Sequence, residues 1–305
     1  MTMGMGNSEP PPNIVDKQND NQIEAKSQKI QVKEKNQFGF FILDLRAWFY
    51  RHRHLHRFLR WPYIDHFGTS VTCRIGPNTW IKSSPKVRLV EAQTMAFVRA
   101  HTSIPVPQIF EVLLDTDGRH YIVMEYIDAS ELTWVWTSLS EDKQQDIINQ
   151  IGKWWTELRQ IPSRGPAICA LDGGPTLDNI SRDFGPYPSF KDFATHYGYS
   201  VLRGKCDSST EAMLDELLAK EHHIVFTHCD LAPRNILVKH GRIVAIIDWE
   251  CAGWFPEYWE AIQIEYANGL EIPSFGKKLV KSVFPEVQNE QRLEYELVPC
   301  IVHEA

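Results

Sequence analysis

The pattern of hydrophobic and polar residues predicts a small β-rich unit in the first half of the chain. Apolar residues alternate with polar ones in short runs bounded by turn-forming residues, which is typical of strands with one buried face. The expected strands cover residues 69–75, 79–82, 109–114 and 120–127. Ser84 and Pro85 suit the N-cap and the first helical position, so a helix is expected from there to about His101.

Helical periodicity dominates the second half of the chain. Ser140 is a good N-cap, and the apolar positions after it recur every three or four residues to about residue 158. Further helices are expected over 190–203 and 209–221. Residues 162–189 are rich in Gly and Pro without periodicity, and a loop this long is usually functional or disordered.

The residues before these elements have a different composition. Residues 1–37 contain no aromatic side chain and are rich in Asn, Gln, Lys and Glu, so we expect a disordered tail. Residues 38–62 combine apolar residues at helical spacing with several arginines, which predicts a basic amphipathic helix. Residues 38–61 either contact a membrane surface or pack an apolar stripe on the lobe that follows, and the second arrangement is the commoner one.

The expected fold is α+β with two lobes, a small antiparallel sheet with one main helix over residues 63–127 and a larger, mostly helical lobe over residues 128–305. The net charge of -7 argues against DNA or RNA as a partner, because nucleic-acid binders usually carry the opposite charge. The same charge is compatible with a cationic substrate.

The sequence shows no sign of export or membrane insertion. No run approaches the ~18 apolar residues of a transmembrane helix, and the N-terminus lacks the pattern of a signal peptide. The six cysteines contain no C-x-x-C pair, which favours reduced thiols over a disulfide framework or a zinc site. These features favour a cytoplasmic location.

The clearest chemical signal lies in residues 226–250, FTHCDLAPRNILVKHGRIVAIIDWE. His228, Asp230 and Asn235 have the spacing H-x-D-x-x-x-x-N, and Asp248 comes directly after an apolar run. Phosphoryl transfer needs a carboxylate that accepts or orients the proton of the attacking hydroxyl. It also needs oxygen ligands that hold magnesium on the triphosphate. Each residue alone has a common structural explanation, but the complete set favours phosphoryl transfer.

Two short apolar runs, 236–238 and 244–247, flank a turn at His240-Gly241 and predict a hairpin. The loop before the first strand and the residue after the second would then lie at the same end of the sheet. We therefore expect Asp230 and Asn235 to face Asp248.

The smaller lobe offers a complementary charge. Lys82 ends the second predicted strand, and Glu91 lies on the helix that follows. A strand lysine paired with a helix glutamate can hold the α- and β-phosphates of ATP. Glu111 is a second possible partner for Lys82.

Several segments together resemble a known family. They are IKSSPKVRLVEAQTMAFV, SIPVPQIFEV, YIVMEYI, GPYPSF, FTHCDLAPRNILV and IIDWECAGWFPEYWE, and the resemblance spans residues from about 70 to 305. The chain resembles the aminoglycoside phosphotransferase and choline kinase-like family, particularly its fungal phosphotransferase-domain members, within the protein-kinase-like fold.

The resemblance implies an ATP- and Mg²⁺-dependent enzyme that phosphorylates a hydroxyl of a small molecule bound near a nucleotide between the lobes. The implied catalytic residues are Asp230, as the base, and His228. The implied magnesium ligands are Asn235 and Asp248. The residues implied for nucleotide binding are Lys82, Glu91, and the hinge residues Met124, Glu125 and Tyr126.

The chain departs at several positions from the pattern of the resembled family or from that of protein kinases. No G-x-G-x-x-G precedes Lys82, Cys229 stands where glycine is common, and Trp249-Glu250 follows Asp248 in place of Phe-Gly. No A-P-E motif follows either, which argues against a protein kinase. A catalytically weak nucleotide-binding scaffold is the alternative function.

Aromatic and acidic residues crowd residues 249–260. This composition fits a pocket for a cationic substrate, through cation–π contacts and carboxylates. It also fits a buried helix that anchors the larger lobe, with its glutamates in local polar networks, and this second interpretation is favoured.

Overall fold

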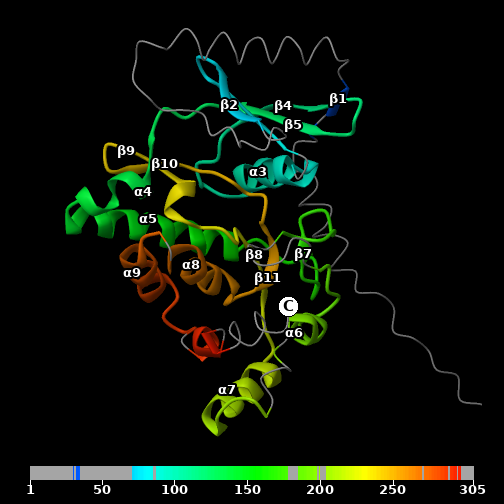
Figure 1. The fold of residues 1–305 in the computed structure, drawn as a ribbon, viewed down its shortest axis with the longest axis vertical. Helices are drawn as coiled ribbons and strands as arrows, with labels where there is room; N and C mark the ends of the chain where they lie inside the picture. The colour runs from blue at the N-terminus through cyan, green and yellow to red at the C-terminus, as the bar shows by residue number, and fades with distance from the viewer. Residues whose placement is uncertain are drawn as a thin grey trace, which may run out of the picture.

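The computed structural model describes residue 30 and residues 32–34, 71–84, 87–177, 185–197, 199, 204–269, 271–287, 289–293 and 295–296. It has the expected α+β architecture, with a sheet and one helix above a larger lobe of helices and short strands (Figure 1). The predicted helix over 38–62 and most of the predicted tail lie outside the described residues. Pro85 and the middle of the 162–189 segment do as well.

The smaller lobe is built on one five-stranded sheet in the order β1-β4-β5-β3-β2. Its strands are β1 (Val32–Glu34), β2 (Val71–Gly76), β3 (Thr79–Ser83), β4 (Ile109–Leu114) and β5 (His120–Glu125). All neighbours pair antiparallel except β1, which runs parallel to β4. The strand predictions for this lobe are confirmed within about two residues.

The strand β1 is a correction to the sequence analysis, which placed it in a disordered tail. Val32 pairs with Val112 of β4, and the ammonium of Lys33 lies 3.3 Å from the carboxylate of Glu111. These three residues are too few to give a periodic pattern, and their partner strand lies far along the chain. The edge position of β4 therefore had to be known before β1 could be predicted.

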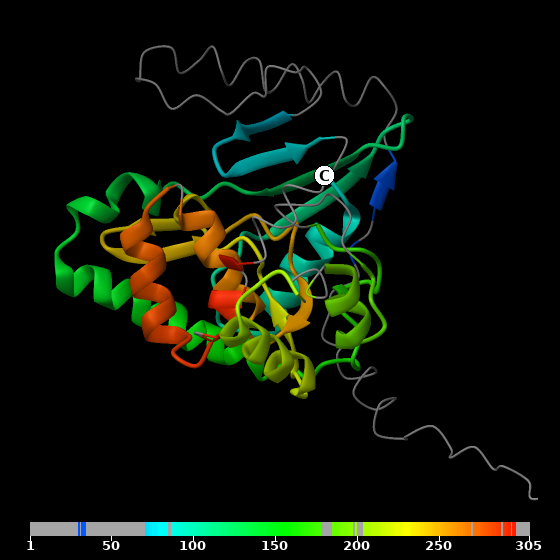
Figure 2. The same ribbon diagram turned by 60° about the horizontal axis from the view of Figure 1, so that its bottom comes forward.

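Helix α3 (Leu89–His101) lies below the sheet and faces the larger lobe (Figures 1 and 2). It ends where predicted but begins later, at Leu89, and its N-cap is Arg88, so the predicted cap at Ser84 is wrong. The N–H of Val87 donates to the carbonyl of Ser84, which closes a turn before the helix. Arg88 also donates to the carbonyl of Pro175 at 2.5 Å. This contact with the larger lobe favours the extended conformation before α3.

The helices of the larger lobe are α4 (Leu132–Val135), α5 (Glu141–Arg159), α6 (Phe190–Tyr197), α7 (Ser208–Ala219), α8 (Trp259–Gly269) and α9 (Pro273–Val283). Two 3₁₀ helices are η1 (Trp136–Ser138) and η3 (Pro233–Asn235). The hydroxyl of Ser140 accepts from the N–H of Lys143, so the predicted N-cap of α5 is confirmed. Helix α6 confirms the first part of the predicted helix over 190–203, and residues 198 and 200–203 lie outside the described residues.

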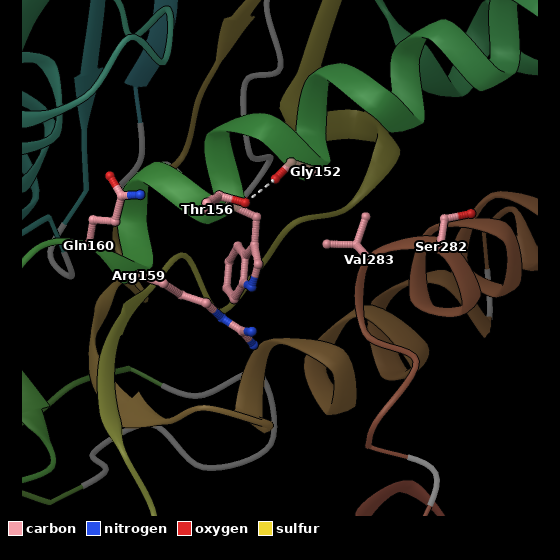
Figure 3. A pocket seen from close by; sticks show the side chains of 7 residues that line it. Gly152, Thr156, Arg159, Gln160, Ser282 and Val283 are labelled. Carbon is pink, nitrogen blue, oxygen red and sulfur yellow. Dashed lines mark hydrogen bonds between the residues drawn. The ribbon is translucent and has the colours of Figure 1, made fainter.

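Helices α5 and α9 border a groove of about 490 Å³ on the outer side of the larger lobe (Figure 3). The side chain of Arg159 lies over the ring of Trp155 and donates to the carbonyl of Glu257 at 2.7 Å. A Cβ at Gly152 would lie 3.4 Å from the side chain of Val283, which is an ordinary van der Waals contact. The groove is lined by structural residues and contains none of the predicted site residues.

Two three-stranded sheets lie beneath the smaller lobe. One joins β10 (Arg242–Ile246), β9 (Ile236–Lys239) and β6 (Ser130–Glu131), and the other joins β7 (Cys169–Ala170), β11 (Gly253–Pro256) and β8 (Ile224–Thr227). The segment 162–189 therefore contributes a strand as well as a loop. Gly253 is required where β11 meets β7, since a Cβ there would lie 2.5 Å from the carbonyl oxygen of Cys169.

The aromatic residues that suggested a cation pocket belong to the core. Each is 2% exposed or less: Trp249, Trp254, Phe255, Tyr258 and Trp259. Their rings contact one another and rings from α3, α6 and β8, as in the stacked pair Phe255 and Trp259 at 5.9 Å. The buried-anchor interpretation is confirmed and the aromatic cation pocket is wrong. Within the described residues no helix is long and apolar enough to cross a membrane.

Candidate active site

The hairpin of β9 and β10 brings Asn235 and Asp248 to the same end of the sheet. Ile236 pairs with Ile246, and the N–H of Ile247 donates to the carbonyl of Asn235 at 2.9 Å. Asn235 ends η3 directly before β9, and Asp248 follows β10 after one residue. The hairpin geometry expected from the apolar runs is therefore confirmed.

Asp230 lies beside this hairpin end, with a side chain that is only 8% exposed. The amide nitrogen of Asn235 donates to Asp230 Oδ2 at 2.7 Å and to the Asp230 carbonyl at 2.8 Å. The guanidinium of Arg234 donates to the other carboxylate oxygen, Oδ1, at 2.5 Å. The carboxylate is thus bound from two directions by neighbours in its own loop.

Lys82 reaches from β3 into a group of three carboxylates. Its Nζ lies 2.9 Å from Glu91 Oε1, 2.7 Å from Asp248 Oδ1 and 3.0 Å from Glu250 Oε2. The expected pair of Lys82 with Glu91 is present, whereas the alternative partner Glu111 pairs with Lys33. This lysine therefore connects α3 of the smaller lobe with the end of the β9–β10 hairpin of the larger lobe.

Burial and charge act against each other in this group. Burial lowers the pKa of Lys82, but the surrounding carboxylates outweigh it and hold the pKa well above its usual value. Burial raises the pKa of Glu91 to about 7, although Lys82 opposes the shift. For Asp248 burial also acts upward, but Lys82 holds the pKa below its usual value. The lysine is therefore charged, and Asp248 is ionised.

The donor set at the hairpin end fits a magnesium ion carried by a triphosphate. The amide nitrogen of Asn235 is bound to Asp230, which leaves its carbonyl Oδ1 as the oxygen ligand. Asp248 is ionised and 33% exposed. In the described part of the chain no three His, Cys, Asp or Glu side chains form a metal cluster. One amide oxygen and one carboxylate, those of Asn235 and Asp248, suit Mg²⁺, which takes one or two carboxylates together with phosphate oxygens and water.

His228 lies behind the loop, 1% exposed, between Asp230 and the second hairpin strand. Its Nδ1 accepts from the N–H of Asp230 at 3.2 Å, so its Nε2 carries the proton and donates to the carbonyl of Ile247 at 3.1 Å. Burial lowers its pKa to about 4, which keeps the ring neutral near pH 7. The ring thus connects the backbone next to Asp230 with the backbone next to Asp248.

Glu260 of α8 holds the same loop from below. It is fully buried, and its Oε2 accepts from the N–H groups of His228 at 2.7 Å and Cys229 at 3.2 Å. Burial raises its pKa to about 7 in spite of these hydrogen bonds. Glu260 could not be predicted as a site residue, because its partners are backbone groups about thirty residues away in the chain.

Two residues of the site have a left-handed backbone although neither is glycine. The φ angle is 65° at Cys229 and 66° at Asp248. Such angles are uncommon for residues with a Cβ and occur preferentially at functional sites. The position of Cys229 is the one where the sequence analysis noted that glycine is common, and its backbone conformation explains that preference.

Comparison with known proteins adds a family to this geometry. The model of the phosphotransferase enzyme family matches residues 81–262, which is more than half of the chain. The matched residues include Lys82, the β9–β10 hairpin and Glu260. The chain belongs to the phosphotransferase enzyme family. A subtelomeric hrmA-associated cluster protein of Aspergillus fumigatus is 36% identical to this chain over 91 residues. That match covers 29% of the chain and only 18% of the fungal protein, and the corresponding protein of a second strain matches equally.

Solved structures support the fold. The streptomycin–ATP ternary complex of APH(2")-IIa matches with a TM-score of 0.50 and 16% identity, over 81% of this chain and 85% of that chain. The gentamicin complex of APH(2")-IIa gives a TM-score of 0.50 and 15% identity, over 83% and 86% of the two chains. At this identity the likeness concerns the kinase-like fold and not the substrate.

The predicted hinge lies where β5 leads into the larger lobe. Two of its N–H groups are bound within the smaller lobe: Glu125 donates to Gln108 at 2.9 Å and Tyr126 to Asn78 at 3.0 Å. The ring of Tyr126 also stacks on Trp80 at 5.8 Å. These contacts fix the end of β5 against the β2–β3 turn, so the hinge backbone has fewer free donors than the sequence suggested.

Besides Glu260, two further site residues were missed, because one binds across the lobes and the other binds within a single turn. Glu250 binds Lys82 across the lobes, and the only signal in the sequence was its place two residues after Asp248. Arg234 binds Asp230 within one turn of η3, and no general rule marks an arginine at this position.

Proposed function

We propose that the protein transfers the γ-phosphoryl group of ATP, as its magnesium complex, to a hydroxyl of a small molecule. One observation carries the proposal: Lys82 of the smaller lobe is bound to Asp248 at 2.7 Å, at the hairpin end that also holds Asn235 and Asp230. Membership of the phosphotransferase family supports the reaction class. The ATP of the APH(2")-IIa ternary complex supports the nucleotide.

The proposed roles follow from the contacts. The oxygen of the acceptor hydroxyl attacks the γ-phosphorus, its proton passes to Asp230, and ADP leaves. Lys82 exchanges one of its carboxylate partners for the phosphates, and Glu91 keeps it in place. Asn235 and Asp248 would hold Mg²⁺, which neutralises charge on the phosphate oxygens when bound. His228 touches no reacting atom in this scheme and is assigned a positioning role.

The adenine is proposed to bind at the hinge of Met124, Glu125 and Tyr126. Since two of these N–H groups are occupied, base pairing is assigned to the hinge carbonyls and to the N–H of the next residue, Ile127. We place the enzyme in the cytoplasm, because the six cysteines of the sequence contain no C-x-x-C pair and show no disulfide framework. The acceptor is proposed to be a metabolite, with an amino sugar or an amino alcohol as the first compounds to test.

The proposal is tested with labelled ATP, Mg²⁺ and a metabolite extract, with the product identified by mass. Asp230→Asn should slow phosphoryl transfer by about 10²- to 10⁴-fold, the usual contribution of a general base, while ATP still raises its melting temperature. Asp248→Ala should lose transfer and also the Mg²⁺-dependent part of the ATP-induced shift. Asp117→Asn, in the exposed turn between β4 and β5, is the matched control.

Undiminished transfer by both site variants would overturn the assigned roles. A wild-type protein that ATP stabilises but that neither transfers phosphate nor hydrolyses ATP would favour the nucleotide-binding scaffold. Labelling of generic protein substrates without any small-molecule product would indicate a protein kinase.

A further inference from the structure

Arg234 connects two carboxylates that lie in different parts of the larger lobe. Its Nη2 donates to Asp230 Oδ1 at 2.5 Å, and its Nη1 donates to Glu271 Oε1. Glu271 lies between the ends of α8 and α9. The side chain of Arg234 is 39% exposed, Glu271 25% and Asp230 8%. The guanidinium thus lies between solvent and the carboxylate assigned as the base.

The two oxygens of Asp230 are bound by different donors. Asn235 binds Oδ2 and Arg234 binds Oδ1. A carboxylate with one donor can rotate about its terminal torsion, which is soft, whereas two donors on opposite oxygens fix its plane. The planar fork of arginine can bind Asp230 and Glu271 at once, which a lysine ammonium does with less directional control.

Residues at the start of α8 and just beyond its end therefore hold the loop of residues 228–230, called the catalytic loop below. Near its start, Glu260 accepts from the backbone of His228 and Cys229. Beyond its end, Glu271 binds Arg234, which binds Asp230. The first contact fixes the loop backbone, and the second fixes the side chain that the backbone carries.

We propose that Arg234 is a positioning residue that sets the orientation of the Asp230 carboxylate, and that Glu271 in turn sets Arg234. The inference rests on the proposed function for its effect on turnover. Arg234→Gln should lower kcat by about 10- to 100-fold, the size expected when a reacting group is misplaced by about 1 Å. The KM for ATP should stay the same, because Lys82 and Asp248 are untouched. Glu271→Gln should have a smaller effect of the same kind.

The experiment measures Mg²⁺-dependent ATP hydrolysis, with water as the acceptor, for Arg234→Gln, Asp230→Asn and the double variant. If Arg234 acts through Asp230, the double variant is no slower than Asp230→Asn alone, and Arg234→Lys recovers part of the lost kcat. Arg242→Gln is the matched control, since it removes the same charge from the exposed far end of the same hairpin. The inference would be overturned if the effects of Arg234→Gln and Asp230→Asn on kcat multiplied in the double variant. It would also be overturned if Arg234→Gln raised the KM for ATP at constant kcat.

A second measurement separates this inference from the function on which it rests. In thermal unfolding, Arg234→Gln should lower the melting temperature of the wild-type protein by more than it lowers that of Asp230→Asn. If the wild-type protein neither hydrolyses ATP nor transfers phosphate, the proposed function fails, and the unfolding comparison alone decides the positioning role. Equal decreases in both backgrounds would show that Arg234 does not hold Asp230.

Discussion

On the side of the catalytic loop that faces the smaller lobe, Lys82 lies among three carboxylates, two of which are about one-third exposed. On the opposite side, His228 and Glu260 are buried. Burial lowers the pKa of His228 to about 4 and raises the pKa of Glu260 to about 7, and both shifts favour the neutral form of the side chain. Charge is therefore concentrated where a nucleotide is proposed to bind and reduced where the loop is only supported.

The difference shows how one short loop meets two requirements. Binding of a magnesium triphosphate needs charged side chains that are already in position. Like charges among these side chains repel one another when the ligand is absent. Support of the loop needs hydrogen bonds that persist without ligand, and buried groups provide them at lowest cost when they are neutral. Variants on the exposed side should therefore affect activity most, and variants on the buried side stability most.

The largest effect is expected on the exposed side, for Lys82→Met. Loss of the ammonium should lower kcat/KM for ATP by at least about 10²-fold, the usual effect of removing one electrostatic contact from a transition state. Glu91 is then buried without its cation. Because it can take up a proton, the loss of stability should be smaller at pH 6 than at pH 8.

Lys33→Met provides the control for this variant. Lys33 is 60% exposed and paired with Glu111, so its loss should change neither activity nor stability measurably. Melting temperatures at the two pH values, together with steady-state kinetics, check the prediction. A larger loss of stability at pH 6 than at pH 8 would contradict it.

On the buried side, Gly253→Ala should cost stability more than activity. The new Cβ would lie 2.5 Å from the carbonyl of Cys169 and 2.9 Å from a methyl group of Thr176, so β7 and β11 must separate. Overpacking of this kind costs about 1–3 kcal/mol in unfolding free energy. Urea unfolding measures it, and Gly152→Ala in α5 should be neutral or stabilising by up to about 1 kcal/mol. Similar losses in both variants would show that the contact is easily relieved.

The smallest effect concerns the pH dependence of stability in Glu260→Gln. The pKa of Glu260 is about 7 in the folded protein and about 4.3 in model peptides, so its contribution to stability falls as pH rises through that window. For His228 the values are about 4 and about 6.5, so its contribution rises with pH. The variant keeps only the second effect. Its unfolding free energy should rise more steeply from pH 4.5 to 6.5, by up to ~1.4 kcal/mol per pH unit.

Unfolding curves of the wild type and the variant across this range provide the test. Glu216→Gln on the exposed face of α7 is the control for the loss of one carboxylate. Parallel curves for the wild type and Glu260→Gln would mean that Glu260 is ionised in the folded protein and that the buried side is charged after all.

The sequence was most informative where chemistry and local pattern coincide. The spacing of His228, Asp230 and Asn235, the apolar hairpin and Asp248 lie within one continuous segment, so the geometry of the site could be predicted from it. Lys82 and Glu91 followed from a strand and a helix that are adjacent in the chain. The two-lobed fold and the family were predicted correctly for the same reason.

Contacts between distant segments could not be predicted. The carboxylate of Glu260 binds backbone N–H groups, which every residue has, so nothing in the sequence marks its partners. The strand β1 was missed because its pairing depends on the position of β4 in the folded sheet. The start of α3 was placed too early because local capping preference competes with the contact between Arg88 and Pro175.

The strand β1 also has a consequence for how copies of the chain interact. Without it, β4 would present a row of unpaired backbone donors and acceptors along the outside of the sheet, next to Phe110, which is 48% exposed. Such a row is a template for association with other chains. Because β1 pairs with β4, the edge of the sheet is a short strand that carries Lys33, and β4 is no longer open to pairing with another chain.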